Sequence, residues 1–116
     1  MSRVFVIQKQ MHMHPTERRL VPKFDVSTAE IFGEVEYLLS AQAAPFSPTP
    51  VIAELARKLQ DYDADTDFLL LVGNPCLIGW AVSLAANASG GRVNLLQWSG
   101  REGRYLPIRA SGLCRS

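Results

Sequence analysis

Four aspartates alternate with other residues in the middle of the chain, at positions 61, 63, 65 and 67. Alternating carboxylates are the ligands of calcium loops of the EF-hand type, which also need a glycine at position six and a glutamate at position twelve. Counted from Asp61, these positions hold Thr66 and Val72, and the register that starts at Asp63 fails in the same way. We therefore expect no metal here and interpret the run as an acidic, solvated connection.

Other side chains that bind metals or act as nucleophiles are few. His12 and His14 would share one side of an extended segment, but no third ligand lies near them in the sequence, so we interpret them as exposed loop residues. Cys76 falls in the first turn of an expected helix, where a thiolate is favoured. A catalytic thiol would also need a base and an orienting group. We therefore interpret Cys76 as a small buried residue and expect no catalytic residue and no cofactor.

Gly73 and Asn74 stand directly before Pro75, where backbone N–H groups at a helix start could hold a phosphate. The chain has neither a Walker lysine nor a Gly-x-Gly-x-x-Gly motif. The turn from a strand into a helix explains all three residues and is the favoured interpretation. Gly73 and Asn74 are thus only weak candidates for anion binding.

Cations and aromatic rings gather near the C-terminus. Such a surface can bind a nucleic acid or an acidic protein. No RRM, zinc-finger or helix-turn-helix signature accompanies it, and an ordinary edge hairpin with solvated arginines is the competing interpretation. The candidate binding residues are Arg92, Trp98, Arg101, Arg104, Tyr105 and Arg109.

The elements that would position these residues centre on one strand–helix–strand unit. An apolar strand at 68–72 leads through an Asn74 cap and Pro75 into a helix at 76–87, which Gly90 or Gly91 ends before a strand at 92–98. The helix has no charged residue, so we expect it to be covered on most sides. This unit is βαβ-like, and parallel or antiparallel pairing of its strands stays open.

The remaining elements complete a single α/β domain, mixed α+β in character, over residues 1–116. Hydrophobic patterns predict strands at 3–8, 20–25 and 33–39, a turn capped by Ser27 or Thr28, and a C-terminal hairpin of 92–98 with 104–109. They also predict an amphipathic helix that begins with a Thr49 cap and Pro50 and continues to Tyr62. We expect a mixed sheet of about six strands with two helices. Pro22 and Pro107 would lie at an edge or a bulge, and the loop 9–19 and the tail 110–116 would be flexible.

Length and charge narrow the class of protein. The 116 residues are 47% hydrophobic, which suits one globular core. Residues 1–24 carry a net charge of +4, residues 25–67 of −7 and residues 92–116 of +4, which gives +1 overall. This segregation could steer a partner. Two cysteines in unlike contexts do not form a disulfide framework and no secretory signal opens the chain, so we expect a cytoplasmic protein without a membrane partner.

Short motifs between Val72 and Ile108 resemble a family of small uncharacterised proteins of tailed phages and proteobacterial prophages. The matching pieces are the residues 72–75, 90–93, 95–98 and 105–108, while 4–8 and the amphipathic helix match more loosely. The resemblance implies a phage origin, and hence the cytoplasm of an infected or lysogenic bacterium, with no known activity, cofactor or site. The family has aspartate where Asn74 and Ser99 stand, so both are weak candidates for an essential carboxylate.

Together these observations favour a small phage-encoded binding protein that is not an enzyme and that engages a host or phage protein, as an inhibitor, an accessory protein or a factor in host takeover. The alternative is a nucleic-acid-binding accessory protein that uses the arginine-rich and aromatic C-terminal hairpin. An exposed edge strand could also pair with its own copy and form a homodimer.

Overall fold

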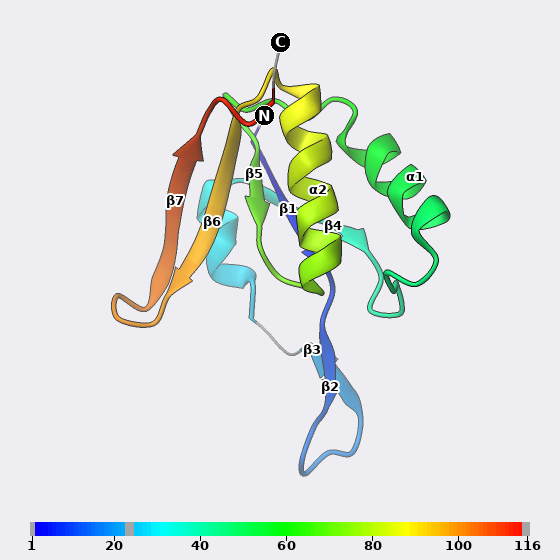
Figure 1. Cartoon of the computed structure of the whole chain (residues 1–116). Coiled ribbons are helices and arrows are strands. Elements are labelled where there is room, and N and C mark those ends of the chain that lie inside the picture. Colours follow the sequence, from blue (N-terminus) through cyan, green and yellow to red (C-terminus); the bar gives the residue numbers. More distant parts are fainter. Residues whose placement is uncertain (1, 23–24, 115–116) are drawn as a thin grey trace.

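A five-stranded mixed sheet forms the centre of the computed structural model, which describes residues 2–22 and 25–114 (Figure 1). Its strand order is β4–β1–β5–β6–β7. The strands are β1 (Arg3–Gln8), β4 (Glu34–Leu39), β5 (Phe68–Leu70), β6 (Val93–Ser99) and β7 (Arg104–Ala110). The first four in this order are parallel, and β7 runs antiparallel to β6 at the edge. The predicted mixed α/β fold is confirmed.

Helices cover the two faces of this sheet unequally. The helices α1 (Pro48–Leu59) and α2 (Pro75–Ala88) pack beside each other on one face, and the 3₁₀ helix η1 (Ser27–Phe32) lies on the other (Figure 1). Alternate residues of β1 show this division, because Phe5 and Ile7 join the core under the α-helices while Val4 and Val6 join the core under η1. All four side chains are buried, as expected for a central parallel strand.

The strand–helix–strand unit has the geometry of a parallel βαβ crossover. Leu69 of β5 pairs with Leu95 of β6 in a parallel register, which resolves the pairing that the sequence left open. The predicted helix ends are confirmed: Asn74 Oδ1 accepts the Cys76 backbone N–H at 2.8 Å, and Gly90 has φ +70° just past the last turn.

Two predicted caps are wrong. Thr49 does not cap α1, because the helix begins at Pro48 and its N-cap position is Ser47, without a side-chain bond. Prolines fit the first turn, where the N–H has no intrahelical partner, so Pro48 extends the helix ahead of Pro50. Before η1, it is Asp25 that binds the Ser27 N–H at 2.9 Å, and neither Ser27 nor Thr28 acts as the cap.

The prediction that α2 is covered on most sides is also wrong. Cys76, Gly79, Ser83 and Asn87 are exposed and recur at helical spacing, so one face of α2 is open to solvent. The absence of charge misled the prediction, because small and neutral polar residues can occupy a solvent face. Cys76 is therefore not a buried residue.

Two short strands stand apart from the main sheet. The strands β2 (Met11–Met13) and β3 (Leu20–Pro22) pair antiparallel as a separate hairpin, which we call the arm. The predicted strand at 20–25 thus belongs to the arm in its first three residues, and 23–24 lie outside the described residues. At the C-terminus, Leu113 N–H donates to the Gly91 carbonyl at 3.0 Å. The flexibility expected of 9–19 and 110–116 stays a prediction.

Candidate functional site

The amino edge of the sheet, where the parallel strands begin, carries an ion pair between a partly buried arginine and a buried aspartate. Asp67, predicted to be solvated, is fully buried, and its Oδ2 accepts a 2.7 Å bond from Arg3 Nη2. Arg3 Nη1 also lies 3.3 Å from Asp61 Oδ2. The Asp63 backbone N–H donates to Asp67 Oδ2 at 3.0 Å. The bond to Asp67 is the main cause that raises the pKa of Arg3. The acidic run is therefore solvated only in part, because its last member anchors the first strand.

A buried polar network continues along this edge. Tyr62 Oη donates to the Asp67 carbonyl at 3.2 Å and accepts the Asn94 backbone N–H at 3.0 Å. The Asn94 side chain donates to the carbonyls of Asp67 and Ala64 and accepts a 3.1 Å bond from Arg109 Nη1. Burial raises the pKa of Tyr62. No described buried side-chain polar atom lacks a partner, so these groups hold the fold together.

The six predicted binding residues fall into three places. Arg92 pairs with Asp65 at 2.9 Å, and Arg109 binds Asn94, so both belong to the amino edge. Trp98 and Tyr105 face each other across β6 and β7, with ring centroids 5.0 Å apart. Arg101 and Arg104 are exposed at the hairpin turn, where Arg104 pairs with Glu102 at 3.2 Å. The hairpin thus does not gather all four arginines around its aromatic residues.

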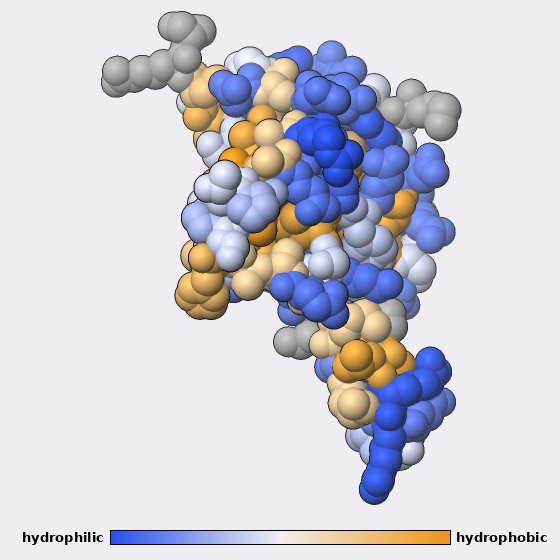
Figure 2. All heavy atoms as spheres, turned by 90° about the vertical axis from the view of Figure 1, so that its right-hand side faces the viewer, coloured by the Kyte–Doolittle hydropathy of each residue, from blue (hydrophilic) through white to orange (hydrophobic). Residues whose placement is uncertain are grey.

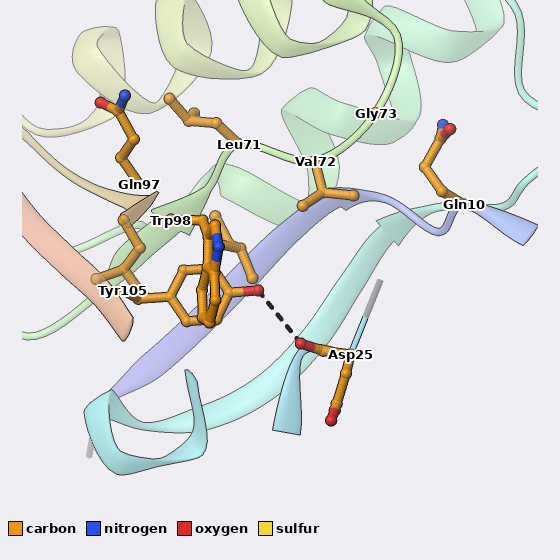
Figure 3. Close-up of a pocket in the computed structure, with 10 residues that line it drawn as sticks. Gln10, Asp25, Leu71, Val72, Gly73, Gln97, Trp98 and Tyr105 are labelled. Atoms are coloured by element: carbon orange, nitrogen blue, oxygen red, sulfur yellow. Dashed lines mark hydrogen bonds between the residues drawn. The ribbon is translucent and has the colours of Figure 1, made fainter. Parts of the chain in front are cut away.

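Trp98 and Tyr105 form one wall of a pocket of about 590 Å³ at the carboxyl edge of the sheet, where the parallel strands end (Figure 3). Its other walls come from the ends of β5 and β6, and Gln10 and Gln97 stand apart on either side. Tyr105 Oη donates to the backbone carbonyl of Asp25 at 3.4 Å. The described residues that line the pocket are Gln10, Asp25, Leu70, Leu71, Val72, Gly73, Leu96, Gln97, Trp98 and Tyr105.

This pocket has the position and size of a binding site. Open α/β sheets bind ligands outside the carboxyl ends of their strands, and ligand pockets measure about 300–1,000 Å³ with mostly apolar walls. Sequence reasoning proposed two of its aromatic residues but not their role as a wall. The missing information is spatial, because the pocket joins segments around residues 10, 25, 72, 98 and 105 that share no local pattern.

Gly73 and Asn74, the weak candidates for anion binding, contact other groups of the same chain. Asn74 N–H donates to Gln8 Oε1 at 2.9 Å, and the Asn74 side chain caps Cys76. Gly73 has φ +138°, and a Cβ there would lie 2.7 Å from the Gln8 Cβ. Both residues therefore support the strand-to-helix turn, although anion binding stays untested. An aspartate at position 74 would accept the same N–H bond.

The arm projects from the carboxyl edge, away from the sheet (Figures 1 and 2). Figure 2 shows hydrophobic atoms along its length beside a hydrophilic tip. Met13 and Leu20 are 57% and 58% exposed, and Arg18 and Arg19 lie near its tip. His12 and His14, expected in a loop, lie on β2 and directly after it.

The described residues form neither a metal-binding cluster nor a membrane-spanning helix. Residues 2–22 and 25–114 contain no group of three or more histidine, cysteine, aspartate or glutamate side chains placed to hold a metal ion. Within the same ranges, no helix has the length and apolar character needed to cross a membrane.

Residues 2–111 match the Phage Pam3 gp32-like protein family. The chain belongs to this family. No curated protein and no solved structure matches it. The phage origin expected from the motifs around Gly73–Asn74 and Trp98 is therefore confirmed.

Proposed function

We propose that this phage protein is a non-enzymatic binding protein that engages a host or phage protein through its β6–β7 hairpin. The observation that carries the proposal is that side chains suited to protein contacts are exposed on both faces of this hairpin and at its turn. Ile108 is 43% exposed on the face that the α-helices cover elsewhere, and Trp98 is 50% exposed on the opposite face. Arg101 and Arg104 are exposed at the turn.

These residue types suit a protein partner. Tryptophan and arginine are enriched among the residues that dominate interface energies, and an aliphatic side chain beside them adds apolar contact area. The hairpin also forms the edge of the sheet, beyond the helix α2 in Figure 1. An inhibitor or accessory role needs only such a surface and no catalytic group.

The test is affinity capture from the lysate of a bacterial host, with identification by mass spectrometry and reconstitution of the complex from purified proteins. We expect one host or phage protein to bind the wild type after nuclease treatment. Ile108→Asp combined with Arg101→Glu should weaken that complex at least about tenfold, because interface positions of this kind contribute more than about 1 kcal/mol each. Arg57→Glu on α1, an exposed arginine far from the hairpin, is the matched control.

A nucleic-acid function is the second candidate, because two arginines lie at a turn whose neighbouring Trp98 is half exposed. It predicts that single-stranded DNA binds with an affinity that falls steeply with salt, and that Arg101→Ala with Arg104→Ala flattens this dependence. Capture that disappears with nuclease would favour this candidate. An affinity that does not respond to salt would exclude it.

A further inference from the structure

The arm exposes an apolar face that the rest of its own chain does not cover. The register pairs Met13 with Leu20 and His12 with Val21. Because side chains alternate along a strand, Met11, Met13 and Leu20 share one face of the arm. A two-stranded hairpin alone is marginally stable in water, and exposed apolar surface of this kind favours a covering partner.

The tip of the arm forms a hydrogen-bonded turn. The ring nitrogen Nδ1 of His14 accepts the Glu17 backbone N–H at 3.0 Å. The backbone N–H of His14 donates to the Arg19 backbone carbonyl at 2.8 Å. Arg18 closes the turn with a left-handed φ of +52°. Hydrogen bonds that order a turn before it binds reduce the conformational entropy lost on binding, so this turn suits insertion into a preformed site.

The pocket at the carboxyl edge offers a matching surface. Its walls are mostly apolar, and Asp25 is the one charged residue among those described that line it. Gln10 precedes β2 and Asp25 follows β3, so the base of the arm borders the pocket. The arm itself points away from the sheet, and neither Met13 nor Leu20 lines the pocket of its own chain (Figure 1).

We propose that two copies of the chain associate about a two-fold axis at the carboxyl edge, each inserting Met13 and Leu20 of its arm into the pocket of the other. A two-fold interface requires each copy to present both halves of the contact side by side, and the adjacent arm and pocket meet this requirement. The apolar face of the arm matches the mostly apolar walls of the pocket. This self-association goes beyond the proposed function and shares Trp98 with its hairpin surface, which also uses Arg101 and Ile108.

The charges at the two ends of this contact are complementary. Arg18 lies at the tip of the arm, and the Asp25 carboxylate lies on the segment that borders the pocket. Bonds from the Ser27 hydroxyl and N–H lower the pKa of Asp25, so its carboxylate is charged at neutral pH. Opposite charges at the rim of an interface favour one docking orientation over others.

Sedimentation equilibrium of the whole chain over a range of concentrations tests the association. We expect a mass of two 12.8 kDa chains for the wild type and of one chain for Met13→Asp combined with Leu20→Asp. Leu113→Asp is the matched control, because Leu113 is 50% exposed but follows β7 at the amino edge, and it should remain a dimer. A wild type that is monomeric at its highest soluble concentration, or an arm variant that is still dimeric, would overturn the proposal.

Cross-linking tests whether the arm enters the pocket of the other copy. In a Cys76→Ser, Cys114→Ser background, Leu20→Cys with Trp98→Cys should form a covalent dimer on mild oxidation. Leu20→Cys alone and Leu113→Cys with Trp98→Cys should not. A covalent dimer from Leu20→Cys alone would indicate arm-to-arm pairing and overturn the insertion, as would no covalent dimer at all. Partner capture reports on the hairpin separately, since the arm variants leave Arg101 and Ile108 unchanged.

Discussion

The two edges of the parallel sheet use polar and apolar residues in opposite ways. At the amino edge, Arg3, Asp67, Tyr62 and Asn94 bond to one another, and the buried polar atoms are satisfied. At the carboxyl edge, mostly apolar residues line an open pocket, and Trp98 beside it and Met13 and Leu20 of the arm are at least half exposed. The difference indicates that the first edge maintains the fold while the second is available for contacts with other molecules.

The largest expected effect follows from removing the buried carboxylate. Asp67→Ala leaves Arg3 without its main partner and also removes the acceptor for two backbone N–H groups. We expect a loss of about 3 kcal/mol in the free energy of unfolding, measured by urea titration. Asp65→Ala removes an exposed pair with Arg92 and should change stability little. Equal effects of the two substitutions would contradict the structural role of the amino edge.

The turn at the carboxyl edge should be the next most sensitive position. Gly73→Ala places a Cβ 2.7 Å from the Gln8 Cβ at a φ of +138°, which alanine rarely adopts. We expect a loss of about 2 kcal/mol in the free energy of unfolding. Gly79→Ala is the control with the opposite sign, because Gly79 lies within α2 with nothing within 4 Å, and alanine should stabilise the helix by up to about 1 kcal/mol. A loss at both positions would contradict this account.

A smaller effect, and a dependence on pH, are expected at Tyr62. Its pKa in the folded protein is raised above 10.0 by burial, so its contribution to stability is complete below that pH and declines as the pH rises through the folded-state pKa. Tyr62→Phe should lower the free energy of unfolding by about 1–2 kcal/mol at neutral pH, since the Asn94 N–H loses its acceptor. Urea titrations above pH 10 should show a shallower alkaline decline for the variant, and an unchanged decline would refute the assignment.

The smallest effect on folding is expected at the arm. Met13→Asp with Leu20→Asp changes side chains that are more than half exposed, so thermal unfolding of a dilute sample should stay within about 0.5 kcal/mol of the wild type. Dilution matters because association would itself raise the apparent stability. A large loss in the dilute sample would mean that the arm is part of the core and would weaken the contrast between the two edges.

Local patterns predicted the elements well. Asn74–Pro75 and the paired glycines at 90–91 mark helix boundaries that depend only on backbone chemistry, and both lie where expected. Pro107 lies in the edge strand β7, as its missing N–H predicts. Contacts between residues distant in the sequence could not be predicted from local patterns. Asp67 was predicted to be solvated because nothing near it indicates a salt bridge to Arg3, 64 residues away. The pocket could not be predicted either, because it arises only when five separate segments meet at one edge.

The positions of residues 3 and 114 determine from which side of the molecule an affinity tag or a fused domain would extend. Both lie at the amino edge, where β1 begins and where the backbone of Leu113 bonds to Gly91 (Figure 1). An affinity tag or a fused domain attached at either end therefore leaves from the side opposite the arm and the hairpin turn. A chain immobilised through such a tag presents its carboxyl edge outward to the solution.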